Sequence, residues 1–317
     1  MRAGSRGRIA GWGWWAGGAA LLGVLLAVVA GGALLRPGAE VDGLAREAPR
    51  TTGYMRYRAA LNGLPADTYR LRWTPLDSIS PLLACAVVKA ADRGFFRHHG
   101  FEWGQMRKSL ARTLRSGAVA GGSTITQQTA RNLFLGPERT FRRKAREAAL
   151  ATRLETGLPK RRILELYLNV IEWGDGVWGA EAASRHHFGK AAARLDAFEA
   201  SFLASLVAAP LQPLTGSNAE RAHRLQLRVL DQLYTSGLID EDEWRVAVLR
   251  AEAVHDDLAA GVPLAAALRP RPGLPVYDLP APFRDDPSRL LPSSALSEEC
   301  GLARELSSTR TPVSFAP

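Results

Sequence analysis

The stretch Gly121-Gly122-Ser123-Thr124-Ile125-Thr126-Gln127-Gln128 carries the strongest local signal for the fold of this 317-residue chain. Ser123 or Thr124 can cap a helix over about 126–133, and the glycine pair before it allows close approach of the backbone. A helix that starts in this way presents free backbone N–H groups, which suit an anion. Taken alone, the pattern more often marks a plain capped helix after a loop.

A second stretch, Arg142-Arg143-Lys144-Ala145-Arg146-Glu147, combines cations with one carboxylate. If Thr140 caps a helix here, Lys144 and Glu147 are neighbours on one face, and Arg143 lies one turn before Glu147. Cations beside a carboxylate hold it ionised next to a phosphate or a metal ion. The alternative is a solvated charged face, which is the usual fate of such a run.

A third stretch, Asp92-Arg93-Gly94-Phe95-Phe96-Arg97-His98-His99-Gly100, follows an apolar run. Its adjacent histidines, His98 and His99, have no Cys or Glu nearby at the spacing of metal ligands. Structural or hydrogen-bonding roles are therefore favoured over metal binding for both.

The rest of the central region reads as helical. After Pro159 apolar residues recur at helical spacing, and Asp196-x-x-Glu199 matches a capping box at a helix start. Two more helices are expected over about 220–233 and 240–253. Because no sustained run of alternating strands is visible, the fold is predicted to be mostly α.

The N-terminal region has the pattern of a membrane anchor. From Ile9 to Leu35 the chain has no charged residue, and this stretch exceeds the roughly 20 residues that a spanning helix needs. Arg2, Arg6 and Arg8 precede it, which predicts a cytoplasmic N-terminus. A cleaved signal peptide is the alternative, but its apolar region is usually only about 7–15 residues long. The net charge of +10 fits nucleic acid, anionic lipid or a phosphorylated substrate, and an anchor disfavours nucleic acid.

The chain is accordingly divided into five segments. They are a cytoplasmic N-terminus (1–8), a transmembrane helix (9–35), a polar connector (36–57), a compact helical domain (58–253) and a Pro/Ala/Arg-rich tail (254–317). The tail is expected to be largely disordered, because it offers little periodic apolar surface to bury. Cys85 lies in an apolar run and is expected to be a core residue, whereas Cys300, in the tail, is expected to be a free thiol.

In their order and spacing, these stretches resemble the motifs of the peptidoglycan glycosyltransferase (transglycosylase) family, specifically its monofunctional, membrane-anchored members. The resemblance covers about residues 81–213. The matching positions are Asp92, Phe95, His98 and Gly100 in the first motif, 121–128 in the second, Arg143, Lys144 and Glu147 in the third, Asn169 in the fourth, and 182–190 in the fifth, where His187 replaces the usual Tyr.

The resemblance implies a lysozyme-like, mostly helical fold and an enzyme that polymerises lipid II into β-1,4 glycan strands, releasing undecaprenyl pyrophosphate. Glu147 would act at the donor phosphate, often through a divalent cation (Mg or Mn), and no organic cofactor is expected. The residues implied to bind the donor pyrophosphate are Lys144, Arg143, Gly121, Gly122, Ser123, Thr124, Gln127, Gln128, Arg131 and Asn132, and those implied to support the cleft are Phe95, His98, Gly100 and Asn169.

The same resemblance implies the surroundings of the protein. Its partners would be lipid II, the growing glycan chain, the inner membrane and proteins of cell-wall synthesis or division, but not nucleic acid. The expected location is the cell inner membrane, crossed once, with the catalytic domain in the periplasm.

One position departs from the family pattern. Ala91 precedes Asp92, where the family carries a catalytic glutamate that serves as general base. General-base assistance is worth about 10²–10⁴-fold, so its loss predicts little turnover unless another group substitutes. The side chain of Asp92 is expected to point elsewhere. Glu102 lies eleven residues after Ala91, at a position where relatives often have Asp, so it is not a displaced copy of the absent glutamate, although the sequence alone excludes neither residue as a substitute.

Three functions therefore remain open from the sequence. The first is an active glycosyltransferase, and the second is a catalytically impaired lipid II-binding or scaffold homologue. The third, a lysozyme-like hydrolase, is disfavoured by the intact 121–128 motif.

Overall fold

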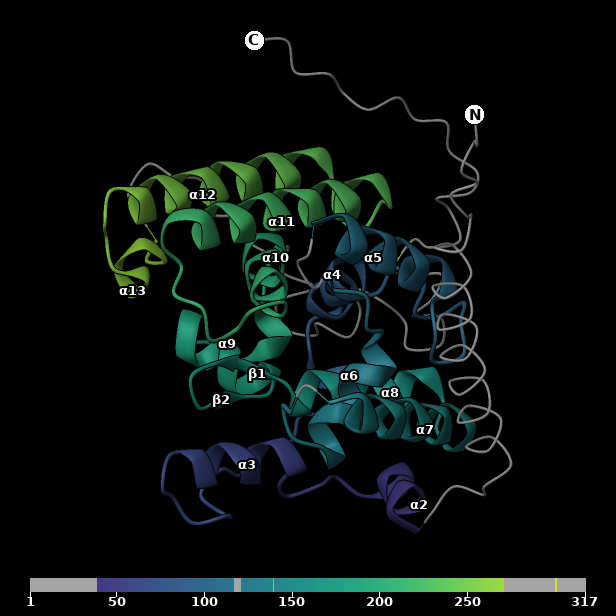
Figure 1. Cartoon of the computed structure of the whole chain (residues 1–317). Helices are drawn as coiled ribbons and strands as arrows, with labels where there is room; N and C mark the ends of the chain where they lie inside the picture. Colours follow the sequence, from purple (N-terminus) through teal and green to yellow (C-terminus); the bar gives the residue numbers. More distant parts are fainter. Residues whose placement is uncertain (1–38, 117–120, 139, 271–299, 301–317) are drawn as a thin grey trace, which may run out of the picture.

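A computed structural model describes residues 39–116, 121–138, 140–270 and 300 of the chain (Figure 1). Within these residues the backbone is mostly helical, as predicted, with one small two-stranded sheet. The elements are α2 (Ala39–Arg46), α3 (Gly53–Leu61), η1 (Leu76–Ser78), α4 (Pro81–Ala91), α5 (Trp103–Ser116), α6 (Ile125–Phe134), α7 (Phe141–Gly157), α8 (Lys160–Val170), β1 (Glu172–Gly174), β2 (Val177–Trp178), α9 (Ala180–Phe188), η2 (Ala192–Arg194), α10 (Ala197–Leu206), α11 (Gly216–Thr235), α12 (Glu241–Ala259) and α13 (Leu264–Ala267).

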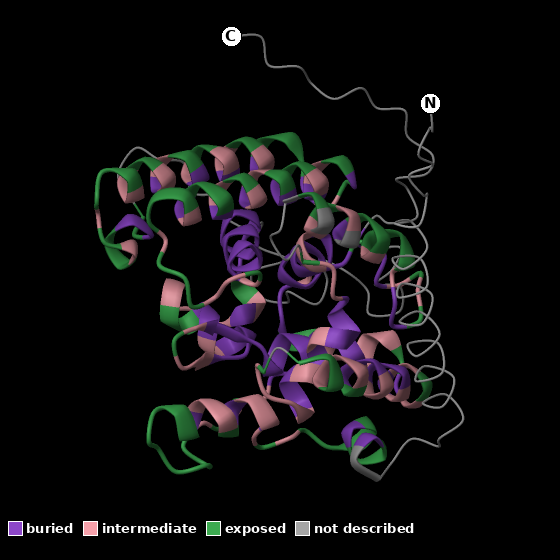
Figure 2. Cartoon of the chain, viewed as in Figure 1, coloured by how far each residue is buried: buried purple, intermediate pink, exposed green. Residues whose placement is uncertain are grey.

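Two apolar helices, α4 and α10, form the centre of the domain. Nearly all their side chains are buried, as expected for helices with apolar residues on every face. The two helices pack against each other and against α11, and α12 packs on α10 and α11. Figure 2 shows both as buried ribbons between the pair α11 and α12 on one side and the group α6–α8 on the other.

Helix α6, the centre of the second group, packs against α3, α7 and α8. Of the two predicted caps, Thr124 serves rather than Ser123, and it forms a capping box with Gln127. The Thr124 side chain accepts from the Gln127 N–H at 3.2 Å, and the Gln127 side chain accepts from the Thr124 N–H at 3.1 Å. Thr140 caps α7, as predicted, by accepting from the Arg143 N–H at 3.2 Å.

A short β-hairpin follows α8, and the sequence pattern did not predict it. Glu172 pairs with Trp178, and Gly174 with Val177, in antiparallel register. The turn between the strands contains Asp175-Gly176, and Gly176 has a φ of +71°, a conformation that glycine adopts without strain. Asp-Gly between apolar residues is a hairpin signal, but strands this short leave no run of alternating residues.

The helical region extends beyond both expected boundaries of the domain. Helices α2 and α3 lie within the segment expected to be a polar connector, and Met55 and Ala59 of α3 are fully buried. At the other end α12 continues to Ala259 rather than 253, because Val254 still packs in the core. The capping box of Asp196 at the start of α10 is confirmed.

The prediction that Cys300 is a free thiol is wrong. Cys300 and Cys85 form a disulfide, and both residues are fully buried. The bond joins positions 215 residues apart, one in the central helix α4 and one in the tail. No local sequence pattern can reveal such a pairing, because it depends on where the tail returns to the domain.

Several predicted segments fall outside the described residues. They are the N-terminus (1–8), the expected transmembrane helix (9–35) and most of the tail, 271–299 and 301–317. Among the helices that the structure describes, none has both the length and the apolar character needed to cross a bilayer.

Candidate active site

The loop that joins α4 to α5 holds the start of α6 through two hydrogen bonds. Asp92 Oδ2 accepts from the N–H of Ile125 at 3.0 Å, and Thr124 Oγ1 donates to the carbonyl of Gly100 at 2.7 Å. The N–H groups of Ile125 and Gln127 therefore have partners within the protein. The sequence pattern indicated free N–H groups at this helix start, but these two are not free for an anion.

Those side chains form an ion cluster between α7 and the loop before α6. Lys144 Nζ donates to Ser123 Oγ at 2.9 Å and to Glu147 Oε1, and Arg143 Nη1 donates to Glu147 Oε2 at 2.5 Å. Glu147 is 1% exposed, which excludes the solvated charged face as an account of this run. Two cations face one carboxylate, so the cluster is positive, and the Lys144 side chain remains 40% exposed to meet an anion.

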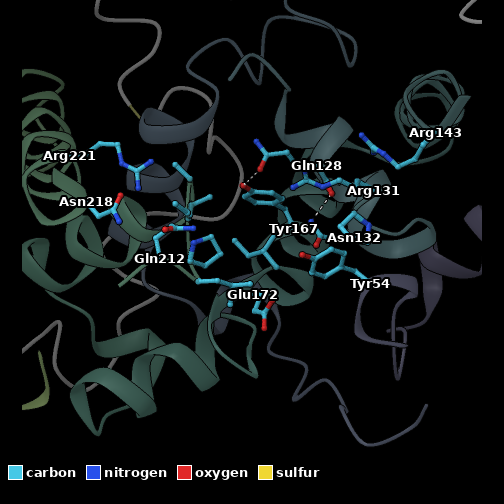
Figure 3. Close-up of a pocket in the computed structure, with 17 residues that line it drawn as sticks. Tyr54, Gln128, Arg131, Asn132, Arg143, Tyr167, Glu172, Gln212, Asn218 and Arg221 are labelled. Carbon is cyan, nitrogen blue, oxygen red and sulfur yellow. Dashed lines mark hydrogen bonds between the residues drawn. The ribbon is translucent and has the colours of Figure 1, made fainter. Parts of the chain in front are cut away.

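A cavity of about 570 Å³ opens beside this cluster. Figure 3 shows Gln128, Arg131 and Asn132 on one side of it and Gln212, Asn218 and Arg221 on the other. The lining residues are Tyr54, Gln128, Arg131, Asn132, Pro137, Arg143, Tyr167, Ile171, Glu172, 207–212, Asn218 and Arg221.

Gln128 connects the cavity to the ion cluster. Its side-chain oxygen accepts from the Tyr167 hydroxyl at 3.0 Å, and its side-chain nitrogen donates to the Ser123 carbonyl at 3.1 Å. Asn132 Nδ2 donates to the carbonyl of Gln128 at 2.8 Å (Figure 3). Through Gln128, α6 thus fixes the position of Ser123, and Ser123 in turn holds Lys144.

Burial shifts the pKa values of three groups that line the cavity. Burial raises the pKa of Tyr167, and burial together with the charge of Glu172 raises the pKa of Tyr54. Burial also raises the pKa of Glu172, although the Gly176 N–H and the Arg58 guanidinium oppose this shift. Both phenols are therefore hydrogen-bond donors at neutral pH.

The predicted residues of the first motif have structural roles: they are buried or form turns and do not line the cavity. Both carboxylate oxygens of Asp92 lie 3.0 Å from His98 Nε2, and the Asp92 side chain is 1% exposed, so it points into the protein as expected. Phe95 is fully buried, with Lys160 Nζ 4.5 Å from its ring centre. Gly100 has a φ of +86°, which other residues rarely adopt.

Asn169 is also structural. Its side chain accepts from the Thr74 N–H and donates to the Thr74 carbonyl, both at 2.9 Å, and donates to the Glu165 carbonyl at 2.8 Å. It is 1% exposed and all its polar atoms have partners, so it fastens the segment before α4 to α8.

The predicted close approach at the glycine pair is present. A β-carbon on Gly122 would lie 2.6 Å from Ser109 Oγ, and Ser109 Oγ donates to the Gly121 carbonyl at 2.6 Å. Glycine at 122 therefore allows α5 to pack against the loop that carries Ser123.

The sequence model of the family described as transglycosylase matches residues 59–234, more than half of the chain. The chain belongs to the transglycosylase family. Similar proteins carry the name biosynthetic peptidoglycan transglycosylase. One from Azoarcus sp. (strain BH72) is 47% identical over 165 residues, which are 51% of this chain and 71% of that protein. One from Rhodospirillum centenum is 49% identical over 139 residues (44% and 60%), and one from Jannaschia sp. is 44% identical over 182 residues (57% and 72%).

As a transglycosylase the chain is a glycosyltransferase, and its matched region includes all the motifs identified above. The structure brings Gln128, Arg131, Asn132 and Arg143 together around the cavity, and Ser123, Lys144 and Glu147 beside it. Ala91, the position of the absent glutamate, is the half-buried last residue of α4 and does not line the cavity.

Several residues that line the cavity were not singled out from the sequence. Tyr54 lies in the expected connector, and Asn218 and Arg221 come from the start of α11. None has a local pattern that indicates a site. Tyr167 and Glu172 lie close to Asn169, within the stretches 162–169 and 172–176 that match the fourth motif, so the resemblance was the one available signal for them.

Proposed function

We propose that this transglycosylase polymerises lipid II into β-1,4-linked glycan strands and releases undecaprenyl pyrophosphate. Family membership supports glycan polymerisation in cell-wall synthesis. The observation that carries the finer proposal is the cluster of Ser123, Lys144, Arg143 and Glu147 beside a polar cavity. It offers a positive, partly exposed site of the kind that a departing pyrophosphate needs.

In the proposed step the acceptor's 4-hydroxyl oxygen forms a bond to the donor's anomeric carbon. The bond between that carbon and the pyrophosphate oxygen breaks, and the hydroxyl proton passes to a base. Negative charge grows on the leaving pyrophosphate, where Lys144 Nζ and Ser123 Oγ are 2.9 Å apart and fixed by Glu147 and Gln128. Donors held in place before the reaction stabilise such charge without reorganisation.

The cavity is proposed to hold the donor's sugars. Its volume of about 570 Å³ lies within the usual range of small-molecule sites, roughly 300–1,000 Å³. Tyr54, Gln212 and Asn218 present groups that can bond sugar hydroxyls, and Arg131 and Arg221 add positive charge.

A divalent cation, Mg or Mn, would have to arrive with the donor's pyrophosphate. Within the described residues no group of three carboxylate, His or Cys ligands is suited to a metal ion. Both oxygens of Glu147 already face Lys144 and Arg143. The protein residues at this site are therefore not suited to coordinate a divalent cation, and the proposed step does not require one.

The proposed location is the periplasmic face of the inner membrane, with the segment 9–35 as anchor. The Cys85–Cys300 disulfide supports this, because disulfides persist mainly outside the cytoplasm. Trp103, 42% exposed at the start of α5, is available to meet the bilayer in which lipid II lies. Proteins of cell-wall synthesis or division remain proposed partners.

The second candidate function is a lipid II-binding scaffold without turnover, and the observation that favours it is Ala91. Purified protein incubated with labelled lipid II separates the two. The rate of lipid II polymerisation should fall by about 10²-fold or more in Glu147→Gln, because this variant lacks the charged carboxylate that positions Lys144. The matched control Glu220→Gln, at an exposed position on α11, should leave activity unchanged. Binding of lipid II without polymer by the unaltered chain, together with polymer from Ala91→Glu, would support the scaffold.

A further inference from the structure

The proposed transfer requires a base for the acceptor's hydroxyl proton, and Ala91 cannot supply one. Asp92 is excluded because both its oxygens contact His98 and one also accepts from the backbone of α6. Glu147 has a cation at each oxygen. Glu155 pairs with Lys160 and accepts from a threonine hydroxyl. Each of these carboxylates is already committed to contacts that hold the site together.

Glu102 differs from them. It is half-buried at the end of the loop between α4 and α5, and the structure describes no ion pair between it and any placed cation. Its Oε1 accepts from the Gly104 N–H at 3.2 Å. The side chain folds back toward the beginning of the same loop, where a β-carbon on Gly94 would lie 2.5 Å from Glu102 Oε2.

Glycine at position 94 therefore makes the room that the Glu102 carboxylate occupies. The φ of Gly94 is not positive, so its backbone does not itself demand glycine. A methyl group there would collide with Oε2 and, at 3.3 Å, press on the His98 ring. The Glu102 carboxylate thus occupies the space that a side chain at position 94 would fill.

The loop that ends at Glu102 begins at the position of the absent carboxylate, although Glu102 is not among the residues that line the cavity. Gly94 is three residues after Ala91, which limits their Cα separation to about 11 Å. The chain turns tightly between them, with the Phe95 N–H donating to the Asp92 carbonyl at 3.0 Å. The loop is bonded to the start of α6 at Asp92 and at Gly100, so its two ends are held in place relative to α6.

We propose that Glu102 is the catalytic base of this enzyme, in place of a carboxylate at position 91. This rests on the proposed function. As the acceptor oxygen bonds to the donor's anomeric carbon, its proton moves to Glu102 Oε2, and the electron pair of the breaking bond leaves with the lipid pyrophosphate. The other oxygen keeps its bond to the Gly104 N–H, which holds the side chain toward Gly94.

The competing account is that Glu102 only caps α5. Glu102→Gln separates the two, because glutamine keeps the oxygen that accepts from Gly104 but is no base. With labelled lipid II, we expect Glu102→Gln to lose about 10²-fold or more in rate while lipid II binding and thermal unfolding stay unchanged. The acid limb of the wild-type pH profile should be absent from its residual activity.

Two further variants make the test decisive. Ala91→Glu/Glu102→Gln should recover activity, since a second carboxylate then reaches the same region, whereas a lost cap would not be restored in this way. Gly94→Ala should also lose activity, because it displaces the Glu102 carboxylate, with Glu220→Gln as the unaffected control. A Glu102→Gln rate within threefold of wild type overturns the proposal, as does failure of the double variant to recover when Ala91→Glu alone is active.

The same set distinguishes failure of this proposal from failure of the proposed function. If the unaltered chain is inactive and Ala91→Glu polymerises, Glu102 is not a base, but the glycosyltransferase site stands. If neither makes polymer while the protein is folded, the proposed function fails and this proposal fails with it.

Discussion

Replacing Cys300 with alanine is expected to lower the free energy of unfolding by about 5 kcal/mol. The disulfide with Cys85 closes a loop of 215 residues, and loop-closure entropy gives this magnitude for a loop of that length. For a domain of this size the loss corresponds to a fall in Tm of roughly 10–20 °C. Both cysteines are fully buried, so a reductant acts slowly on the folded protein and mutation is the cleaner perturbation.

The assay is thermal unfolding of wild type, Cys300→Ala, Cys85→Ala and the double variant. The single variants and the double variant should have nearly equal Tm values, because the bond is lost once either cysteine is gone. Cys85→Ala should fall slightly further, since it also leaves a small cavity in α4. Equal Tm values for wild type and Cys300→Ala, together with two titratable thiols in denatured wild type, would refute the disulfide.

Substitutions at the ion cluster and in the core should also have measurable effects. Lys144→Met should reduce lipid II polymerisation by about 10²–10³-fold in protein that is still folded, because it removes a donor to the leaving pyrophosphate; an unchanged rate would contradict this. Burial raises the pKa of Glu243 from 4.5 to about 7, so the folded state keeps a proton that the unfolded state loses, and stability falls as pH rises through this window by up to about 3 kcal/mol. Glu243→Gln should therefore raise Tm relative to wild type at pH 8 and much less at pH 4.5, and a gap independent of pH would count against it. Gly122→Ala should lower the free energy of unfolding by about 1–3 kcal/mol, because its methyl group meets Ser109, and chemical denaturation measures this.

Local patterns in the sequence were sufficient to predict the features that depend on neighbours along the chain. The caps Thr124 and Thr140 and the capping box at Asp196 each involve a side chain and an N–H three residues on. The spacing of Lys144 and Glu147 likewise predicted that they lie on the same face of α7, where they form an ion pair. The Asp-Gly hairpin had a local signal too, but its strands are too short to alternate.

Contacts between segments that are distant in the chain could not be predicted from the sequence. The bond from Asp92 to the N–H of Ile125 removes a donor that the glycine-rich start of α6 was expected to offer, and it spans 33 residues. The cavity combines Tyr54 from α3 with Arg221 from α11, which no periodicity relates. The position of Glu102 beside Gly94 required coordinates, although Gly94 lies in the first motif and Glu102 only two residues after its end.

We propose that this chain transfers glycans although it has Ala91 at the position of the family's glutamate. The most direct test compares the rate of polymerisation of labelled lipid II by the unaltered protein and by Ala91→Glu. We predict that the unaltered protein makes glycan strands at a rate within tenfold of the variant, because Glu102 already serves as base. Polymer from the variant alone would contradict this and indicate a lipid II-binding protein without turnover.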